Sequence, residues 1–159
     1  MLKIHHLGHS QSERIVWLCE ELELPYELVH HTRDTVTRLS PPELKALHPL
    51  SAAPLLEDGD LLLAESAAIV EYTIVKHGGG RLKPGPEHAD YAAFLYWFHF
   101  SNGNLQAVMG RMMMVTRAKL PADHPVQMSV QGRLGKVLAL VEARLGEATW
   151  PVASSTRTE

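Results

Sequence analysis

The chain has 159 residues, of which 45% are apolar and 21% are charged, and its formal net charge is -3. That length suits one ordinary domain or two small domains, and the apolar fraction is typical of a globular protein rather than a disordered one. The scattered charges give no footprint for nucleic acid, and no apolar run approaches the roughly 20 residues that span a bilayer. We therefore expect a globular protein without a nucleic-acid or membrane partner.

The N-terminus and the cysteine content indicate a compartment. The N-terminus lacks the features of an export signal. The single cysteine, Cys19, suits a reducing compartment such as the cytoplasm, and its apolar helical position predicts a buried side chain rather than a nucleophile. The ten histidines show no metal-ligand spacing, so we predict no metal site. The adjacent pairs His5-His6 and His30-His31 should point to opposite faces of their strands.

The first 80 residues alternate between strand and helix patterns. The apolar run Leu2 to Leu7 predicts a strand, and Ser10 to Leu22 carries apolar residues at helical spacing before a proline. Tyr26 to His30 predicts a second strand, so these elements form a right-handed parallel unit. Pro42 to Leu47 predicts a short helix with proline at its start.

A hairpin and a helix complete this half. Leu55-Leu56 and Leu61 to Leu63 flank an Asp-Gly pair, which is a strong hairpin signal. Ser66 to Lys76 predicts a helix that a run of three glycines ends. The remainder is helical over Glu87 to Val115 and Val126 to Leu145. We therefore predict an α/β domain over residues 1–82 and an all-helical domain over residues 87–159.

Two dipeptides predict a site for an extended, peptide-like ligand. If the bond in Ala53-Pro54 is cis, the N–H and C=O of Ala53 are left for a ligand to pair with. Glu65-Ser66 stands at the first turn of a helix, where free N–H groups favour a carboxylate and Glu65 can bind an ammonium group. The plainer alternatives are a trans proline on an edge strand and Ser66 as a simple N-cap.

These motifs together resemble the glutathione-binding half of the glutathione transferases. The residues that carry the resemblance are His48-Pro49, Ala53-Pro54, Asp58-Gly59, Leu63-Ala64-Glu65-Ser66 and Ala68-Ile69. Those that resemble the serine-type bacterial and fungal branch are His5-His6-Leu7, Ser10-Gln11-Ser12-Glu13-Arg14 and Trp17 to Leu22. The resemblance covers Leu2 to Gly80, with a weaker helical match to Leu145. It implies a thioredoxin-like first domain, an incomplete helical bundle after it, glutathione as co-substrate and a homodimer.

The family places a catalytic hydroxyl just after the first strand, where this chain has Ser10. A hydroxyl donor favours a thiolate over the thiol, whose pKa is near ~8.5. One charge-assisted hydrogen bond contributes roughly 1.5–3 kcal/mol, and one unit of pKa needs about 1.4 kcal/mol. Ser10 and Glu13 also have capping-box spacing, so Ser10 can instead cap the helix. Ser12 and His9 are the alternative candidates for thiol activation.

The resemblance also implies the remaining substrate contacts. Family members often have a basic residue two positions before the proline, where this chain has Ala52. Lys45 and His48 are the candidates to replace it, or else ordinary surface charges. An apolar electrophile is expected between the domains, against the first long helix. The predicted lining residues are Phe100, Leu105, Met109 and Met113, for which the alternative is plain helical core.

The sequence thus predicts an enzyme that activates the glutathione thiol for attack on an apolar electrophile. The alternative is a glutathione-binding module without catalysis, and a glutaredoxin-like exchanger is disfavoured because the Ser10 loop has no cysteine. The polar stretch Ala148 to Glu159 does not resemble the family, so the chain is expected to end early. Helices without partners should then pack loosely, and protease should leave a core that ends near Leu82.

Overall fold

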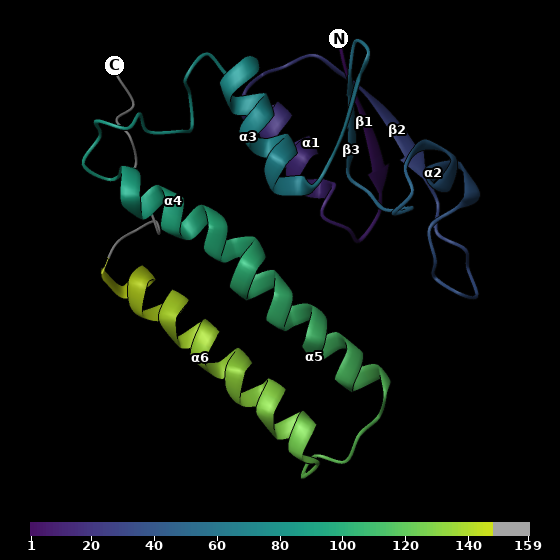
Figure 1. Cartoon of the computed structure of the whole chain (residues 1–159), viewed down its shortest axis with the longest axis vertical. Coiled ribbons are helices and arrows are strands. Elements are labelled where there is room, and N and C mark those ends of the chain that lie inside the picture. Colours follow the sequence, from purple (N-terminus) through teal and green to yellow (C-terminus); the bar gives the residue numbers. More distant parts are fainter. Residues whose placement is uncertain (148–159) are drawn as a thin grey trace. The chain divides into compact units, whose positions relative to one another are not determined.

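The computed structural model describes residues 1–147 and divides into two compact units, one from Met1 to Leu82 and one that begins at Lys83 (Figure 1). The polar stretch 148–159, from which we expected an early end of the chain, lies outside the described residues.

A four-stranded sheet with the order β2-β1-β3-β4 forms the centre of the first unit. Its strands are β1 (Leu2–Leu7), β2 (Tyr26–His31), β3 (Leu55–Asp58) and β4 (Leu61–Ala64). β1 runs parallel to β2 and antiparallel to β3, which in turn pairs antiparallel with β4. Gly59 in the β3–β4 turn has a φ of 60°, a conformation that glycine adopts without steric cost. This is the predicted thioredoxin-like arrangement.

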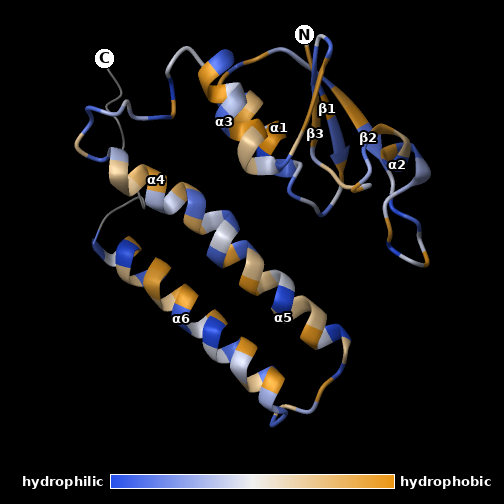
Figure 2. Ribbon diagram, in the orientation of Figure 1, coloured by the Kyte–Doolittle hydropathy of each residue, from blue (hydrophilic) through white to orange (hydrophobic). Residues whose placement is uncertain are grey.

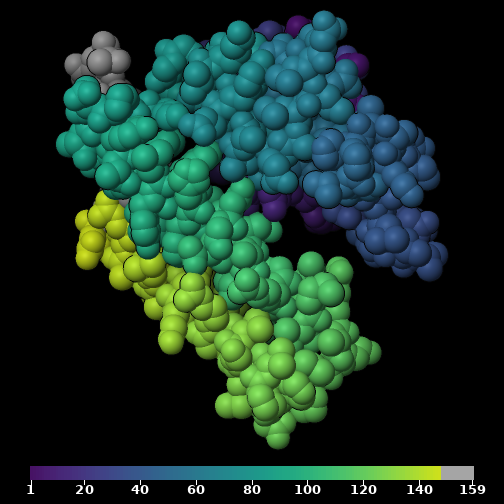
Figure 3. All heavy atoms as spheres, in the orientation of Figure 1, coloured from purple at the N-terminus to yellow at the C-terminus, as the bar shows by residue number. Residues whose placement is uncertain are grey.

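Helices cover both faces of this sheet. The apolar faces of α1 (Glu13–Glu21) and α3 (Ser66–Lys76) pack on one face (Figure 1). Their core there consists of Leu2, Ile4, Ile15, Cys19, Leu56 and Ile69. The short helix α2 (Pro42–Leu47) packs on the other face, where Leu44 meets Leu7 and Leu55. The loop of residues 32–41, between β2 and α2, projects from this unit (Figures 1 and 3).

The predicted elements of this unit are confirmed, with one change at the start of α1. We expected this helix to begin at Ser10, but it begins at Glu13 after a turn. The alternative role of Ser10 as the cap of this helix is wrong, because the Ser10 hydroxyl accepts a hydrogen bond from the N–H of Ser12 rather than of Glu13. The Glu13 carboxylate instead accepts from the N–H of His9 at 3.0 Å.

The second unit is helical, as predicted. α4 (Tyr91–Phe100), the π-helical segment η1 (Ser101–Gln106) and α5 (Ala107–Arg117) form one continuous rod, alongside which α6 (Pro125–Glu147) runs back (Figure 1). Residues 101–104 are weak helix formers, which accounts for the irregular turn. The core of this unit contains Phe100, Val108 and Val137.

Large apolar side chains are also exposed on this helical unit, along α5 and α6. The ribbons of both helices carry apolar and polar residues in alternation along their length (Figure 2). They are Met109, Met113, Met114, Val126, Met128, Leu138, Leu140 and Leu145. Within residues 1–147, no helix combines the length and the apolar character that crossing a membrane requires.

Candidate functional site

The register of the sheet brings three predicted segments to one edge. β1 ends at Leu7, and β3, which runs the opposite way, begins at Leu55. Leu55 in turn pairs with Ala64, the last residue of β4. The loop after β1, the Ala53–Pro54 dipeptide before β3 and the turn after β4 therefore share one edge. The sheet thus brings three of the segments that the sequence proposed for the site to one edge: the Ser10 loop, Ala53-Pro54 and Glu65-Ser66.

A direct contact joins two of these segments. The hydroxyl of Ser66, the first residue of α3, donates a hydrogen bond to Oε1 of Gln11 in the loop after β1. Both side chains are partly or fully buried. Gln11 was not predicted as a site residue, because nothing local in the sequence indicates a partner 55 positions away. The contact fixes the loop of Ser10 against the start of α3.

Ser12 holds the same loop against the end of β1. Its side chain has no exposed surface, and its Oγ accepts a hydrogen bond from the N–H of Leu7 at 3.1 Å. Oγ also lies 2.9 Å from Nδ1 of His6 and 2.7 Å from Oγ of Ser10. Because Ser12 is fully buried, it holds the loop and does not reach a ligand.

Ser10 is the exposed end of this group. It is half-buried, and its Oγ accepts the N–H of Ser12 at 3.2 Å. Arg33 supports the loop next to it, donating from Nε to the carbonyl of Gly8 at 3.2 Å and from a terminal nitrogen to that of His9 at 3.4 Å. Of the three candidates for thiol activation, Ser10 thus combines partial exposure with a fixed hydroxyl, whereas His9 is exposed on the loop.

The start of α3 is where the sequence predicts a carboxylate to bind. Glu65 occupies the N-cap position with a φ of 70°, a conformation that is uncommon for a residue with a side chain. Ser66 is therefore the first helical residue, and the alternative of Ser66 as N-cap is wrong. The first turn of an α-helix carries the positive end of the helix dipole, so this end of α3 favours a negative charge. The exposed Glu65 carboxylate stands beside this end, so one edge offers both signs of charge.

The Ala53–Pro54 segment lies against α2. The peptide bond between the two residues is cis, and Pro54 is buried. Ala53 packs on the cluster of Leu7, Leu44 and Leu55, and it precedes the first paired residue of β3. The backbone of Ala53 is thus positioned by α2 and lies outside the ladder of the sheet.

The two basic candidates differ in their surroundings. Lys45 is exposed on α2. His48 is half-buried directly after this helix, and its Nδ1 accepts the N–H of Leu50 at 3.3 Å. Ala52, which lies between His48 and Ala53 in the sequence, is exposed. A contact of Lys45 or His48 with a ligand stays a prediction.

Burial affects two groups on the α1 side of β1. Burial lowers the pKa of His6, the electrostatic interaction with the neighbouring His30 adds to this lowering, and Glu13 opposes it. Burial also raises the pKa of Cys19 to about 11, with Glu20 contributing. Cys19 is therefore a protonated thiol without exposed surface, as predicted, and it is no nucleophile.

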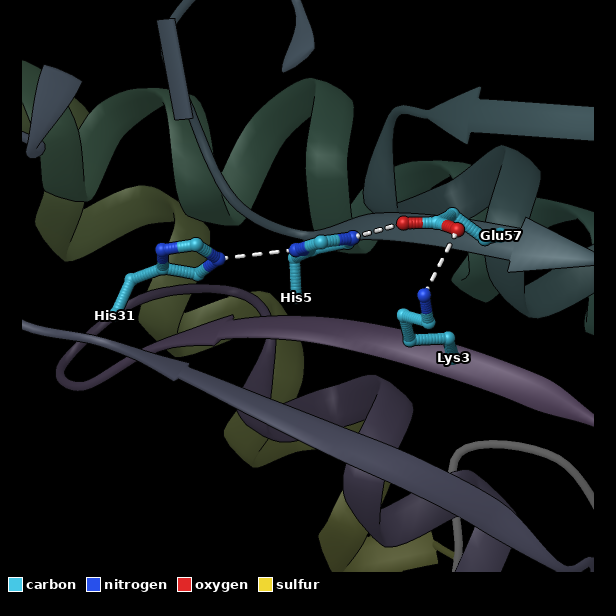
Figure 4. A network of polar contacts seen from close by, with 4 residues as sticks. All are labelled: Lys3, His5, His31 and Glu57. Carbon is cyan, nitrogen blue, oxygen red and sulfur yellow. Dashed lines mark hydrogen bonds and ion pairs between the residues drawn. The ribbon is translucent and has the colours of Figure 1, made fainter. Parts of the chain in front are cut away.

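A separate polar network lies on the opposite face of the sheet (Figure 4). Nε2 of the buried His5 is 2.6 Å from Oε1 of Glu57, and its Nδ1 is 2.9 Å from Nε2 of His31. Lys3 approaches the other oxygen of Glu57 at 3.3 Å. The hydrogen bond from His5 lowers the pKa of Glu57, and burial lowers the pKa of His31. His5 lies with His31 on this face, and His6 lies with His30 on the other. The prediction that the two members of each adjacent pair point to opposite faces is confirmed.

The residues predicted for the second substrate fall into two groups. Phe100 is buried in the core of the helical unit, and Leu105 is partly buried against it. Met109 and Met113 are about half exposed on α5. The role of all four residues in a substrate pocket stays a prediction. In the described residues 1–147, no group of three or more histidine, cysteine or acidic side chains could hold a metal ion.

Comparisons with known proteins identify the family. Residues 2–74 match the model of the "Glutathione S-transferase, N-terminal domain". The chain is 40% identical over 106 residues to glutathione S-transferase 3 of Schizosaccharomyces pombe, covering 66% of this chain and 43% of that protein. A crystal structure of a glutathione S-transferase from Actinobacillus pleuropneumoniae is 34% identical with a TM-score of 0.83, covering 95% of this chain and 69% of that one. The chain belongs to the glutathione S-transferase family.

Two further facts bear on how far this likeness extends. The chain spans less than half the length of the Schizosaccharomyces pombe protein. A glutathione transferase from Pseudomonas putida shares the fold with a TM-score of 0.78 at 20% identity, and its crystal structure contains one glutathione disulfide per subunit.

Proposed function

We propose that the first unit binds glutathione at this edge of the sheet and that Ser10 stabilises the glutathione thiolate. The observation that carries the proposal is the convergence of the half-buried Ser10 hydroxyl, the Ala53 backbone and the start of α3. The backbone of Ala53 pairs with the extended peptide. The N–H groups of α3 bind the α-carboxylate of the γ-glutamyl end, and Glu65 binds its ammonium group. Lys45 or His48 binds the glycine carboxylate.

The chemistry follows from a hydrogen bond to the anion. The thiol proton leaves to water, and the Ser10 hydroxyl donates to the sulfur anion. The thiolate then forms a carbon–sulfur bond with an apolar electrophile, whose leaving group departs with its electron pair. One charge-assisted hydrogen bond contributes roughly 1.5–3 kcal/mol, so Ser10 changes the rate roughly 10- to 100-fold.

The test is conjugation of glutathione to a chloronitroarene by the full chain. We expect turnover above the uncatalysed rate and a roughly 10- to 100-fold loss in Ser10→Ala. Ser129→Ala, at an exposed position of α6, is the matched control and should keep the activity of the natural chain. Equal rates in Ser10→Ala and Ser129→Ala would overturn the role of Ser10.

A second measurement separates catalysis from binding alone. Glutathione binding by calorimetry without turnover would identify the alternative function, a glutathione-binding module without catalysis. No binding at millimolar glutathione would overturn both. We further propose that the protein works as a homodimer in the cytoplasm, for which light scattering at micromolar concentration should give twice the chain mass.

A further inference from the structure

Three side chains connect Ser10 to the interior of the first unit. Oγ of Ser10 lies 2.7 Å from Oγ of Ser12, and Oγ of Ser12 lies 2.9 Å from Nδ1 of His6. Ser10 is half-buried, Ser12 is fully buried, and His6 comes from β1. The hydroxyl assigned to the thiolate is thus the outer end of a continuous hydrogen-bonded relay.

Counting donors and acceptors shows that this relay has two possible directions. Oγ of Ser12 already accepts the N–H of Leu7, so it has one lone pair and one hydrogen left. In the first direction, Nδ1–H of His6 donates to Ser12, and the Ser12 hydroxyl donates to Ser10. Oγ of Ser10 then accepts both the N–H and the O–H of Ser12, and its two lone pairs are occupied. Its own hydrogen is left to donate outward.

The second direction has the opposite consequence for the ligand. If Nδ1 of His6 lacks a hydrogen, it accepts from Ser12, and Ser12 in turn accepts from Ser10. The hydrogen of Ser10 then points inward, and the outward side of its oxygen carries only a lone pair. A lone pair accepts a thiol S–H and repels a thiolate, so this direction would raise the pKa of the thiol. The tautomer of His6 therefore decides whether Ser10 favours the thiolate.

When Nδ1 of His6 carries a hydrogen and donates, the Ser12 hydroxyl has one acceptor that competes with Ser10. Besides Ser10 at 2.7 Å, it can reach the carbonyl of Leu7 at 3.3 Å. The shorter contact has the length typical of an O–H···O hydrogen bond, and the longer one exceeds that range. Ser10 is therefore the better acceptor, and in the first direction the lone pairs of both serine oxygens are occupied while the hydrogen of Ser10 is kept for the ligand.

We infer that His6 is a positioning residue, which donates from Nδ1–H to Ser12 and thereby turns the hydroxyl of Ser10 toward the glutathione sulfur. This inference rests on the proposed function of Ser10 and adds the side chain that sets its direction. Burial and the electrostatic interaction with His30 lower the pKa of His6, and Glu13 on α1 opposes this lowering. Both the neutral Nδ1–H tautomer and the imidazolium carry the required hydrogen.

The test compares two substitutions at His6 that differ in where they place an amide nitrogen. The amide of His6→Asn lies near the position of Nδ1 and can donate to Ser12, whereas the longer His6→Gln places it elsewhere. The readout is the pKa of the thiol of bound glutathione, from the ultraviolet absorbance of the thiolate. We expect His6→Asn to stay near the natural chain, and His6→Gln to raise this pKa by about one unit, a tenfold loss of thiolate.

Ser10→Ala and a thiol-blocked ligand distinguish the possible failures. Calorimetry with S-methylglutathione should give equal affinity in all variants, which shows that the site is intact. If Ser10→Ala raises the thiol pKa and His6→Gln does not, the relay is overturned while the role of Ser10 stands. If Ser10→Ala leaves this pKa unchanged, the proposed function fails and the relay fails with it. A lower thiol pKa in His6→Gln would establish the second direction and contradict the inference.

Nitrogen NMR of the natural chain tests the tautomer of His6 without any substitution, so the result does not depend on whether a variant folds. The chemical shifts of the two imidazole nitrogens report which of them carries hydrogen. A hydrogen on Nδ1 of His6 supports the relay. A neutral His6 with its hydrogen on Nε2 overturns it.

Discussion

Leu44 links the stability of α2 to the affinity of the site. It is the buried residue of this six-residue helix, it has no exposed surface, and it packs on Leu7 and Leu55 together with Ala53. α2 has no side-chain cap, so its attachment depends on this contact. A buried leucine truncated to alanine costs about 2–5 kcal/mol. The first unit spans residues 1–82, and a unit of that size has a stability of about 4–12 kcal/mol. Leu44→Ala should therefore detach α2 without unfolding the sheet.

We expect Leu44→Ala to weaken ligand binding more than an equally destabilising substitution elsewhere in the first unit does. We expect the Kd of S-methylglutathione, measured by calorimetry, to rise about tenfold or more, which corresponds to ~1.4 kcal/mol. The matched control is Ile74→Ala, another buried aliphatic residue of this unit, about 12 Å along α3 from Ser66. Urea unfolding should give both variants a similar stability loss, and Ile74→Ala should bind within twofold of the natural chain. Equal affinities in the two variants would refute the role of α2.

Three further predictions concern pH, charge and domain structure. The pKa values of His6 and His31 are lowered in the folded chain, so the unfolded chain binds more protons below about pH 6.5. The free energy of unfolding should therefore fall as the pH drops through that region. A free energy of unfolding by urea that does not change with pH would contradict this. Ala52→Lys should tighten glutathione binding by up to about fivefold, since an exposed ion pair contributes about 0.2–1 kcal/mol. The uncharged control Ala52→Gln should not tighten it. Equal affinities of the two variants in calorimetry would show that the glycine carboxylate of glutathione does not lie near residue 52. Limited proteolysis with mass detection should cut first within residues 83–90, the segment of the second unit that precedes α4. A first cut inside residues 1–82 would contradict this division.

Local patterns were sufficient to predict the elements of the first unit. Apolar runs around an Asp-Gly turn define a hairpin almost regardless of context, and the structure has β3 and β4 on either side of Asp58 and Gly59. The start of α3 followed from Ser66 in the same way. The order of these elements along the chain then left few topologies for the sheet.

The errors lie where distant residues decide the local structure. The Ser10–Glu13 spacing fits a capping box, but Ser12 turns inward to bond Leu7, so α1 begins three residues later. This choice depends on the end of β1 and is invisible in the helix sequence alone. The contact of Gln11 with Ser66 and the π-helical turn in the long rod are of the same kind, since each depends on packing rather than on local preference.

The central claim is that glutathione binds where the loop of Ser10, the Ala53–Pro54 segment and the start of α3 meet. An NMR titration of glutathione into the uniformly nitrogen-labelled chain tests it directly, because each backbone N–H reports its own surroundings. We predict the largest shift changes at the amides of Ser10, Ala53 and Ser66, all at the same edge of the sheet. Changes confined to the opposite edge, at the turn of Gly59, or no change at millimolar glutathione would contradict the account.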